Sequence, residues 1–187
     1  LLRERGITMP VVVLNADADS FDQMIANRLE PEIYSFRSLA DFADAVSHAG
    51  ETRYPVHIKL DTGMHRLGFM EGEIGRLCEV LPTLPAVKVA SVFSHLNCAD
   101  MPEEDAYTRE QIARYDRMSA AVAASLPYSV IRHTANSAAI ERFPEARFDM
   151  CRLGLGLYGF GWEHNAGLRP VSALKTRIVQ ILSLIHI

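Results

Sequence analysis

Short apolar runs alternate with amphipathic segments along most of this chain, and this alternation limits how it can fold. Six runs have the length and residue types of strands, and they lie at 10–14, 32–36, 56–60, 87–95, 129–134 and 148–158. The first, PVVVL, is apolar throughout, as expected of a strand that is buried on both faces of a sheet. The connections are long enough for right-handed crossovers between parallel strands. The sequence therefore predicts a parallel α/β architecture, either an open doubly wound sheet or a (β/α)8 barrel with fewer than eight strands.

Helical spacing of apolar residues predicts a helix in most of the connections. Four such segments lie at about 21–29, 38–50, 74–81 and 104–126. Ser20 is expected to cap the first of them. Ser38, with Asp41 three residues later, is expected to open the second, which Gly50 ends.

Composition and charge disfavour several classes of function. The net charge is -4 and no cluster of Lys and Arg interrupts it, which disfavours binding to nucleic acids or to anionic membranes. Three widely spaced cysteines without a C-x-x-C pair indicate neither a disulfide framework nor a zinc site, and a reducing cytoplasm is the expected setting. No apolar run approaches the roughly 20 residues that span a bilayer. No G-x-G-x-x-G opens a helix, which argues against a dinucleotide site.

Polar residues follow nearly every predicted strand. The stretch VHIKLDTGMHRLGF, at 56–69, places several ionisable groups around one strand end. The strand exits together supply Lys59, Asp61, Arg66, His95, His133, Asn136, Ser137, Arg152, Gly154 and Leu155. In a barrel these ends share one mouth, and a hydroxyl with glycine amides near the last strands suits a phosphate-bearing ligand. A solvated turn or a satisfied core histidine explains any one of these residues alone.

Four sequence blocks resemble, in order and spacing, the signature motifs of bacterial alanine racemases. They are KLDTGMHRLGF, SHLNCAD followed by TREQ, HTANS, and FDMCRLGLGLYG. The resemblance implies the fold-type III barrel that binds pyridoxal 5'-phosphate (PLP), followed by a C-terminal β domain and acting as a homodimer. This chain would then be an internal fragment, with strands three to eight in residues 1–170, the start of the β domain at 171–181 and a non-native tail at 182–187. The TGMHR form is most similar to racemase modules of Bacteroidetes type, which can be fused behind a muramyl-peptide ligase.

The resemblance also implies roles for individual residues. Arg66 would reach the phenolic oxygen of the cofactor and the substrate carboxylate, and Lys59 matches a lysine that some members carbamylate to orient that arginine. Arg152 matches the arginine that faces the pyridine nitrogen. The remaining implied cofactor-binding residues are His95 and His133 beside Arg152, and Asn136, Ser137, Gly154 and Leu155 around the phosphate.

Two expected catalytic groups have no match in this chain. The family lysine that holds the cofactor, in a motif such as VVKANAYGHG, is absent, because the only lysines are Lys59, Lys88 and Lys175. The tyrosine expected in the C-terminal β domain is absent as well. The prediction is a cytoplasmic, PLP-dependent alanine racemase that interconverts L- and D-alanine for peptidoglycan synthesis, of which this fragment alone is inactive. The alternatives are a serine or broad-specificity racemase of the same fold type, and a non-catalytic PLP-binding barrel protein.

Overall fold

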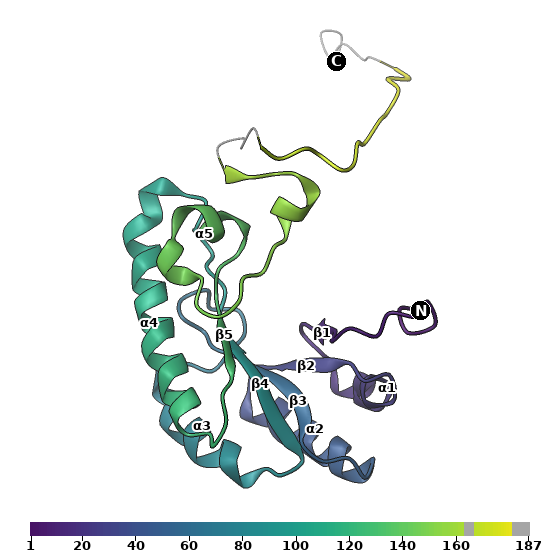
Figure 1. Ribbon diagram of the computed structural model, residues 1–187, viewed down its shortest axis with the longest axis vertical. Coiled ribbons are helices and arrows are strands. Elements are labelled where there is room, and N and C mark those ends of the chain that lie inside the picture. Colours follow the sequence, from purple (N-terminus) through teal and green to yellow (C-terminus); the bar gives the residue numbers. More distant parts are fainter. Residues whose placement is uncertain (163–166, 181–187) are drawn as a thin grey trace, which may run out of the picture.

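The computed structural model describes residues 1–162 and 167–180, and the expected tail at 182–187 lies outside them. Its five strands form one parallel sheet in which the spatial order follows the order along the chain (Figure 1). They are β1 (Val12–Val13), β2 (Glu30–Ile33), β3 (Tyr54–Lys59), β4 (Val87–Phe93) and β5 (Ile131–His133). A doubly wound sheet has a point where the strand order reverses, and the described strands have none, so the arrangement is that of an open barrel.

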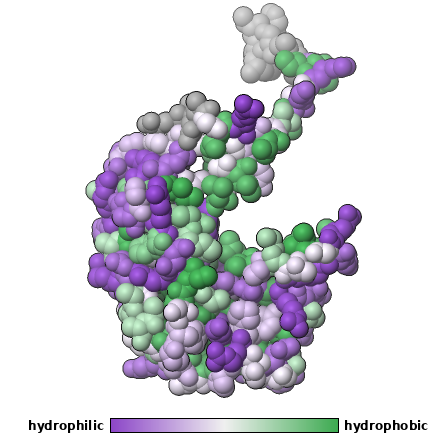
Figure 2. Space-filling model, in the orientation of Figure 1, coloured by the Kyte–Doolittle hydropathy of each residue, from purple (hydrophilic) through white to green (hydrophobic). Residues whose placement is uncertain are grey.

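Helices α1 to α4 connect the strands and cover the outside of the curved sheet, and α5 follows β5 (Figure 1). They are α1 (Phe21–Ala26), α2 (Phe36–His48), α3 (Ile74–Val80), α4 (Asp105–Ala124) and α5 (Ser137–Arg142). Opposite the helices the molecule is hollowed, with apolar residues on both walls of the hollow (Figure 2). None of the described helices is long and apolar enough to cross a membrane.

The main core lies between the sheet and the helices α1 to α4. Strand residues on that face, such as Val56 and Ile58, are fully buried. Phe42 of α2 packs edge-on against both Phe21 and Tyr54, with ring centroids 5.0 and 5.5 Å away. Because side chains alternate along a strand, the residues between them, His57 and Lys59, belong to the opposite face, inside the barrel.

Most predicted elements are present within a few residues of the expected bounds, with one clear error. The predicted strand at 148–158 is wrong, because this segment contains no strand and ends in a 3₁₀ helix at Leu155–Tyr158. It does run beside β5, where the Asp149 N–H donates to the Arg132 carbonyl at 3.0 Å. The Arg132 N–H, however, donates to the carboxylate of Asp149 at 2.8 Å. A side chain thus takes the place of the backbone acceptor that a ladder of strands requires.

Two helix starts also differ from expectation. The N-cap of α2 is Ser35, and Ser38 is the third helical residue, whose hydroxyl in turn accepts the Ser35 N–H at 3.2 Å. The helix α5 was not predicted, because six residues are too few for helical periodicity to be visible. Among the described residues 168–180 no helix or strand is present, so a β domain beginning at 171 stays a prediction.

Candidate functional site

A cavity of about 410 Å³ opens at the carboxyl ends of the first four strands. Its lining residues come from β2, β3 and β4, from the loops after β1, β3 and β4, and from the segment after α5: Leu14, Asn15, Glu32, Lys59, Arg66, Leu67, Phe93, His95 and Arg152. Four residues predicted from the sequence, Lys59, Arg66, His95 and Arg152, are thus brought together. With three basic side chains against one carboxylate, the cavity suits a ligand that carries negative charge.

Lys59 is the last residue of β3 and is only 5% exposed. Its Nζ lies 5.7 Å from the centre of the Phe93 ring. Burial lowers the pKa of the Lys59 amine, while the Glu32 carboxylate partly offsets this effect and Arg152 adds to it. The amine therefore loses its proton more readily than an exposed lysine does.

The loop from 60 to 69 leaves the end of β3 and returns to it, which holds Arg66 over the cavity. Phe69 donates its N–H to the Lys59 carbonyl and accepts the Asp61 N–H, both at 2.9 Å. Gly68, with φ of +128°, makes the close return possible. Arg66 itself is exposed and makes no hydrogen bond or ion pair with any described residue. Its guanidinium is therefore available to a ligand.

The carboxylate of Asp61 and the helix α4 fix the outer part of this loop. The Oδ1 atom of Asp61 accepts the N–H groups of Gly63 at 2.9 Å and of His65 at 3.1 Å. From α4, the Tyr107 hydroxyl donates to the Gly63 carbonyl at 2.8 Å, and Arg114 donates to the Thr62 carbonyl at 3.0 Å. The loop is thus positioned before any ligand arrives.

Arg152 is the most extensively bonded side chain of the site. Its Nη1 atom donates to the Nδ1 atom of His133 at 2.8 Å and to the His133 carbonyl at 3.3 Å. Its Nη2 atom donates to the carbonyls of Ser94 and Thr134 at 2.6 and 3.1 Å. Burial lowers the pKa of Arg152 to about 10, so the guanidinium stays charged at neutral pH. Only its Nε–H is left without a partner among the described residues.

The two predicted histidines are both held neutral. Burial, with Arg152 as the next cause, lowers the pKa of His133 to about 3 and that of His95 to about 4. His133 lies stacked on Phe93, with ring centroids 5.1 Å apart, and does not line the cavity itself. His95 does line it, with Nδ1 3.4 Å from the Nη2 atom of Arg152.

The predicted phosphate-binding residues form a separate group, in which Ser137 at the start of α5 contacts the glycine segment just after Arg152. The hydroxyl oxygen of Ser137 accepts the N–H groups of Gly154 at 2.9 Å and of Gly156 at 3.2 Å. Leu155 between them is 68% exposed. Asn136 has a structural role here: its Oδ1 atom caps α5 at Ala139, and its Nδ2 atom donates to the Leu96 carbonyl.

Among the site residues that the sequence analysis missed, Glu32 and Ser94 make the polar contacts closest to the predicted residues. Glu32 lines the cavity and accepts the Asn15 N–H at 2.6 Å. Ser94 supplies the carbonyl that Arg152 contacts, and its hydroxyl donates to the Leu60 carbonyl at 2.8 Å. Glu32 lay at the start of a predicted strand, so nothing marked it as a strand-exit residue. Ser94 immediately precedes the predicted site residue His95, and this position in the sequence could have indicated it.

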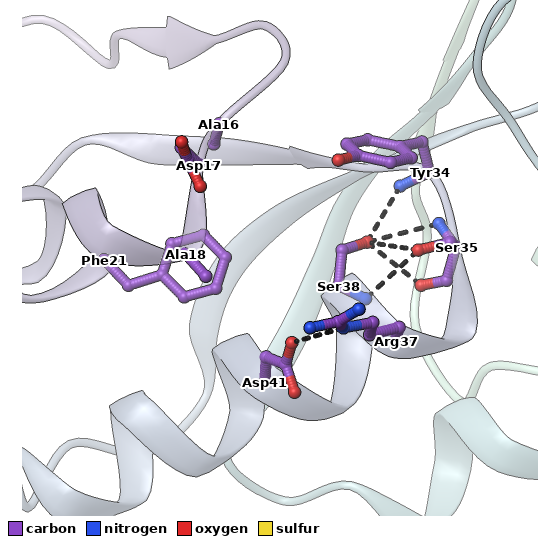
Figure 3. A pocket seen from close by; sticks show the side chains of 9 residues that line it. All are labelled: Ala16, Asp17, Ala18, Phe21, Tyr34, Ser35, Arg37, Ser38 and Asp41. Carbon is purple, nitrogen blue, oxygen red and sulfur yellow. Dashed lines mark hydrogen bonds and ion pairs between the residues drawn. The ribbon is translucent and has the colours of Figure 1, made fainter.

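A second hollow lies between α1 and the start of α2 (Figure 3). Four of its polar side chains have structural partners. Ser35 and Ser38 bind each other across the helix cap, and Arg37 forms an ion pair with Asp41 at 3.5 Å. None of the residues predicted for the site lines this hollow.

Comparison with known proteins gives consistent matches to one family. The family model described as alanine racemase, N-terminal domain, matches residues 1–161. An alanine racemase of Desulfovibrio desulfuricans is 36% identical over 96% of the chain, and the chain spans 49% of its length. The solved alanine racemase of Streptomyces lavendulae is 28% identical, with a TM-score of 0.82 over 90% of the chain and 46% of its own. That of Bartonella henselae, solved with covalently bound pyridoxal phosphate, is 22% identical, with a TM-score of 0.75 over 90% of the chain and 49% of its own. The expected family is confirmed, and the fold is a partial barrel of this type.

Proposed function

Because this chain belongs to the alanine racemase N-terminal domain family, we propose that the whole protein interconverts L- and D-alanine with PLP as its cofactor. The chain spans about half the length of the relatives it matches. The activity is therefore proposed for the protein that contains this chain, and not for these residues alone. The observation that carries the proposal is Arg152, a charged guanidinium with one free donor at a cavity rich in basic groups.

The donor groups of this chain fit PLP in two places. The phosphate would bind at Ser137, whose hydroxyl hydrogen remains available while its oxygen accepts two glycine N–H groups. The pyridine nitrogen would accept a hydrogen bond from Arg152. Gly154 is two positions after Arg152, a span of about 7 Å along the chain, so a ligand about as long as PLP can reach both groups. Leu155 would contribute its backbone N–H beside the phosphate, and Asn136 would hold Ser137 in place by capping α5.

When bound, PLP supplies the electron sink that lets the α-proton of alanine leave. Arg152 donates a hydrogen bond to the ring nitrogen without giving up its proton, because a guanidinium stays protonated in proteins. The neighbouring histidines support this state. Both His95 and His133 are neutral, so neither one offers a competing positive charge or a proton to the ring.

Arg66 and Lys59 would act on the side of the cofactor away from Arg152. The free guanidinium of Arg66 is suited to a bidentate contact with the substrate carboxylate. The lowered pKa of Lys59 favours the neutral amine that carbamylation requires. In that step the amine nitrogen forms a bond to the carbon of CO₂ and loses one proton to solvent, leaving a carbamate anion that would pair with Arg66.

The remaining features of the proposal concern the whole protein. We propose that it is a cytoplasmic homodimer that supplies D-alanine for peptidoglycan, with the cofactor-binding lysine and the second catalytic base outside these residues. The chain has only three lysines, of which Lys59 alone lines the cavity.

Racemisation by the purified full-length protein with PLP tests this function. L-alanine should be converted to D-alanine, which chiral chromatography measures, and L-serine should be converted much more slowly. Arg152→Gln should lower kcat/KM by about 100-fold, as loss of a buried charged donor does. Arg142→Gln is the matched control, since Arg142 is also a partly buried arginine but contacts Ala99 and Asp105 instead of the cavity. Absence of alanine racemisation by the unmodified protein would refute the proposal, and equal losses in both variants would refute the role of Arg152.

A further inference from the structure

A row of hydrogen bonds crosses four strands inside the barrel and ends at Arg152. Glu30 of β2 lies 2.7 Å from the Nε2 atom of His57 on β3, and the Nδ1 atom of His57 lies 2.6 Å from the Ser91 hydroxyl on β4. The same hydroxyl lies 3.0 Å from the Nε2 atom of His133 on β5, whose Nδ1 atom is 2.8 Å from Arg152. None of Glu30, His57 and Ser91 lines the candidate cavity.

The centre of the row follows the register of the sheet, and its two ends are offset from it. His57 and Ser91 are paired residues of β3 and β4. Glu30 lies two residues before the partner of His57 on β2, and His133 lies two residues after the partner of Ser91 on β5. His57, Ser91 and His133 are each at most 8% exposed, so water does not compete freely for these contacts. Buried polar groups that are fully satisfied hold one arrangement firmly, because each lost hydrogen bond leaves an unpaired group in a poor solvent.

The chemistry of the two ends fixes the direction of every hydrogen bond in the row. Arg152 can only donate, so the Nδ1 atom of His133 must accept, and the hydrogen of this neutral ring is on Nε2. That Nε2–H donates to the oxygen of Ser91.

At the other end a carboxylate at Glu30 can only accept, so a neutral His57 ring in this row carries its hydrogen on Nε2 and presents Nδ1 as an acceptor. The Ser91 hydroxyl hydrogen then donates to His57. The directions set by the two ends agree at Ser91, whose oxygen accepts from His133 and whose hydrogen donates to His57. All four hydrogen bonds therefore point from Arg152 towards Glu30.

We propose that Glu30, His57 and Ser91 are positioning residues, which hold His133 in its Nε2–H tautomer and thereby orient Arg152. The other tautomer would place an N–H of His133 against an N–H of Arg152, and the guanidinium would have to turn away. The assignment of the tautomer stands on the geometry alone. Only the consequence for the reaction rests on the proposed function, through the contact of Arg152 with the ring nitrogen.

Nitrogen NMR of the full-length holoprotein, labelled with ¹⁵N-histidine, tests the proposal directly. Long-range ¹H–¹⁵N correlations distinguish the two tautomers of a neutral imidazole. In the unmodified protein His133 should show a single Nε2–H tautomer, with Nδ1 as the acceptor. Ser91→Ala removes the acceptor of the Nε2–H, so the two nitrogen signals of His133 should move towards a common, averaged position. In the same variant kcat should fall about 10-fold with little change in KM, as when a supporting partner is lost.

Three further variants make the test decisive. Ser91→Thr keeps the hydroxyl and should restore the single tautomer. Glu30 lies at the more exposed end of the row, so Glu30→Gln remains informative if Ser91→Ala folds poorly. It should shift the His133 signals in the same direction as Ser91→Ala. Ser119→Ala is the matched control, since Ser119 is another buried serine whose hydroxyl contacts an arginine, Arg132, outside the row.

Unchanged His133 signals in both Ser91→Ala and Glu30→Gln would overturn the proposal, as would an Nδ1–H tautomer in the unmodified protein. The NMR result does not depend on turnover. A protein that shows the expected tautomer shift but no racemisation would therefore refute the proposed function and leave the positioning role intact.

Discussion

Gly68 occupies a place in the loop over the cavity where no other residue fits without a shift of the backbone. A Cβ atom there would lie 2.6 Å from the Asp61 nitrogen and 2.7 Å from the Leu60 carbonyl carbon. The φ angle of +128° is also one that residues with a side chain rarely adopt. Both obstacles are backbone atoms next to Lys59, so any movement that relieves them changes the cavity.

We expect Gly68→Ala to lower the free energy of unfolding by about 2–3 kcal/mol, because strain of this kind costs that much. Urea unfolding followed by circular dichroism measures it in the full-length protein. Gly72→Ala is the control: a Cβ at Gly72 would meet nothing within 4 Å, and its effect should stay within about 0.5 kcal/mol. Equal effects of the two substitutions would show that Gly68 is not constrained as described.

Individual site residues could be predicted where an ionisable side chain lies at or near the end of a predicted strand. Lys59 and His95 lie at the ends of predicted strands, Arg152 lies beside the glycines of the segment at 148–158, and all three line the cavity. Glu32 does so as well but was not foreseen, because β2 ends three residues earlier than the predicted strand and its polar end was read as its beginning. The capping role of Asn136 also needed the structure, since α5 is too short to be seen in the sequence.

At the scale of elements, the two serines that precede α1 and α2 differ in what they contribute. Ser35 is the N-cap of α2, and its side chain accepts the Ser38 N–H at 3.1 Å. Ser20 precedes α1, but its side chain makes no capping hydrogen bond and instead donates to the Asp17 carbonyl. The same residue type at the same position is thus expected to have unequal effects on stability.

We expect Ser35→Ala to lower the free energy of unfolding by about 1 kcal/mol, the usual cost of a lost N-cap. Ser20→Ala should cost clearly less. Thermal or urea unfolding of the two variants, side by side, measures the difference. A Ser20→Ala variant as unstable as Ser35→Ala would contradict this account of the two helix starts.

Helices could be predicted where apolar periodicity extends over several turns. Elements could not be predicted where a single local contact determines whether a segment pairs as a strand. The helix α4 was expected at 104–126 and is found at Asp105–Ala124. The segment at 148–158 has the composition of a strand, but the Asp149 carboxylate takes the N–H that would pair it with β5. A competition between a side chain and a backbone carbonyl cannot be read from composition.

At the scale of the whole molecule, the described sheet has two open edges beside exposed apolar side chains. The edge strand β1 is only two residues long, and β5 is the other edge. Large apolar side chains that are more than half exposed lie along the segment after β5, and they are Leu153, Leu155, Leu157, Tyr158 and Phe160. Unpaired strand edges beside exposed apolar surface favour association between chains.

We therefore expect a preparation of these 187 residues alone to self-associate with rising concentration and to show no racemisation of alanine with PLP. Sedimentation velocity over a range of concentrations and chiral chromatography measure the two effects. The full-length protein, measured at the same concentrations, is the control. A monodisperse monomer would contradict the first expectation, and turnover above that of free PLP would contradict the second.

The order of the strands in the sheet has a further consequence, for synthesis on the ribosome. Because β1 to β5 lie side by side in the order in which they are translated, each new strand finds its partner already outside the ribosome. Each described strand after β1 can therefore pair with the strand that was synthesised just before it. Translation proceeds at about 5–20 residues per second, slower than short connections close, so this part of the sheet can grow one strand at a time as the chain emerges.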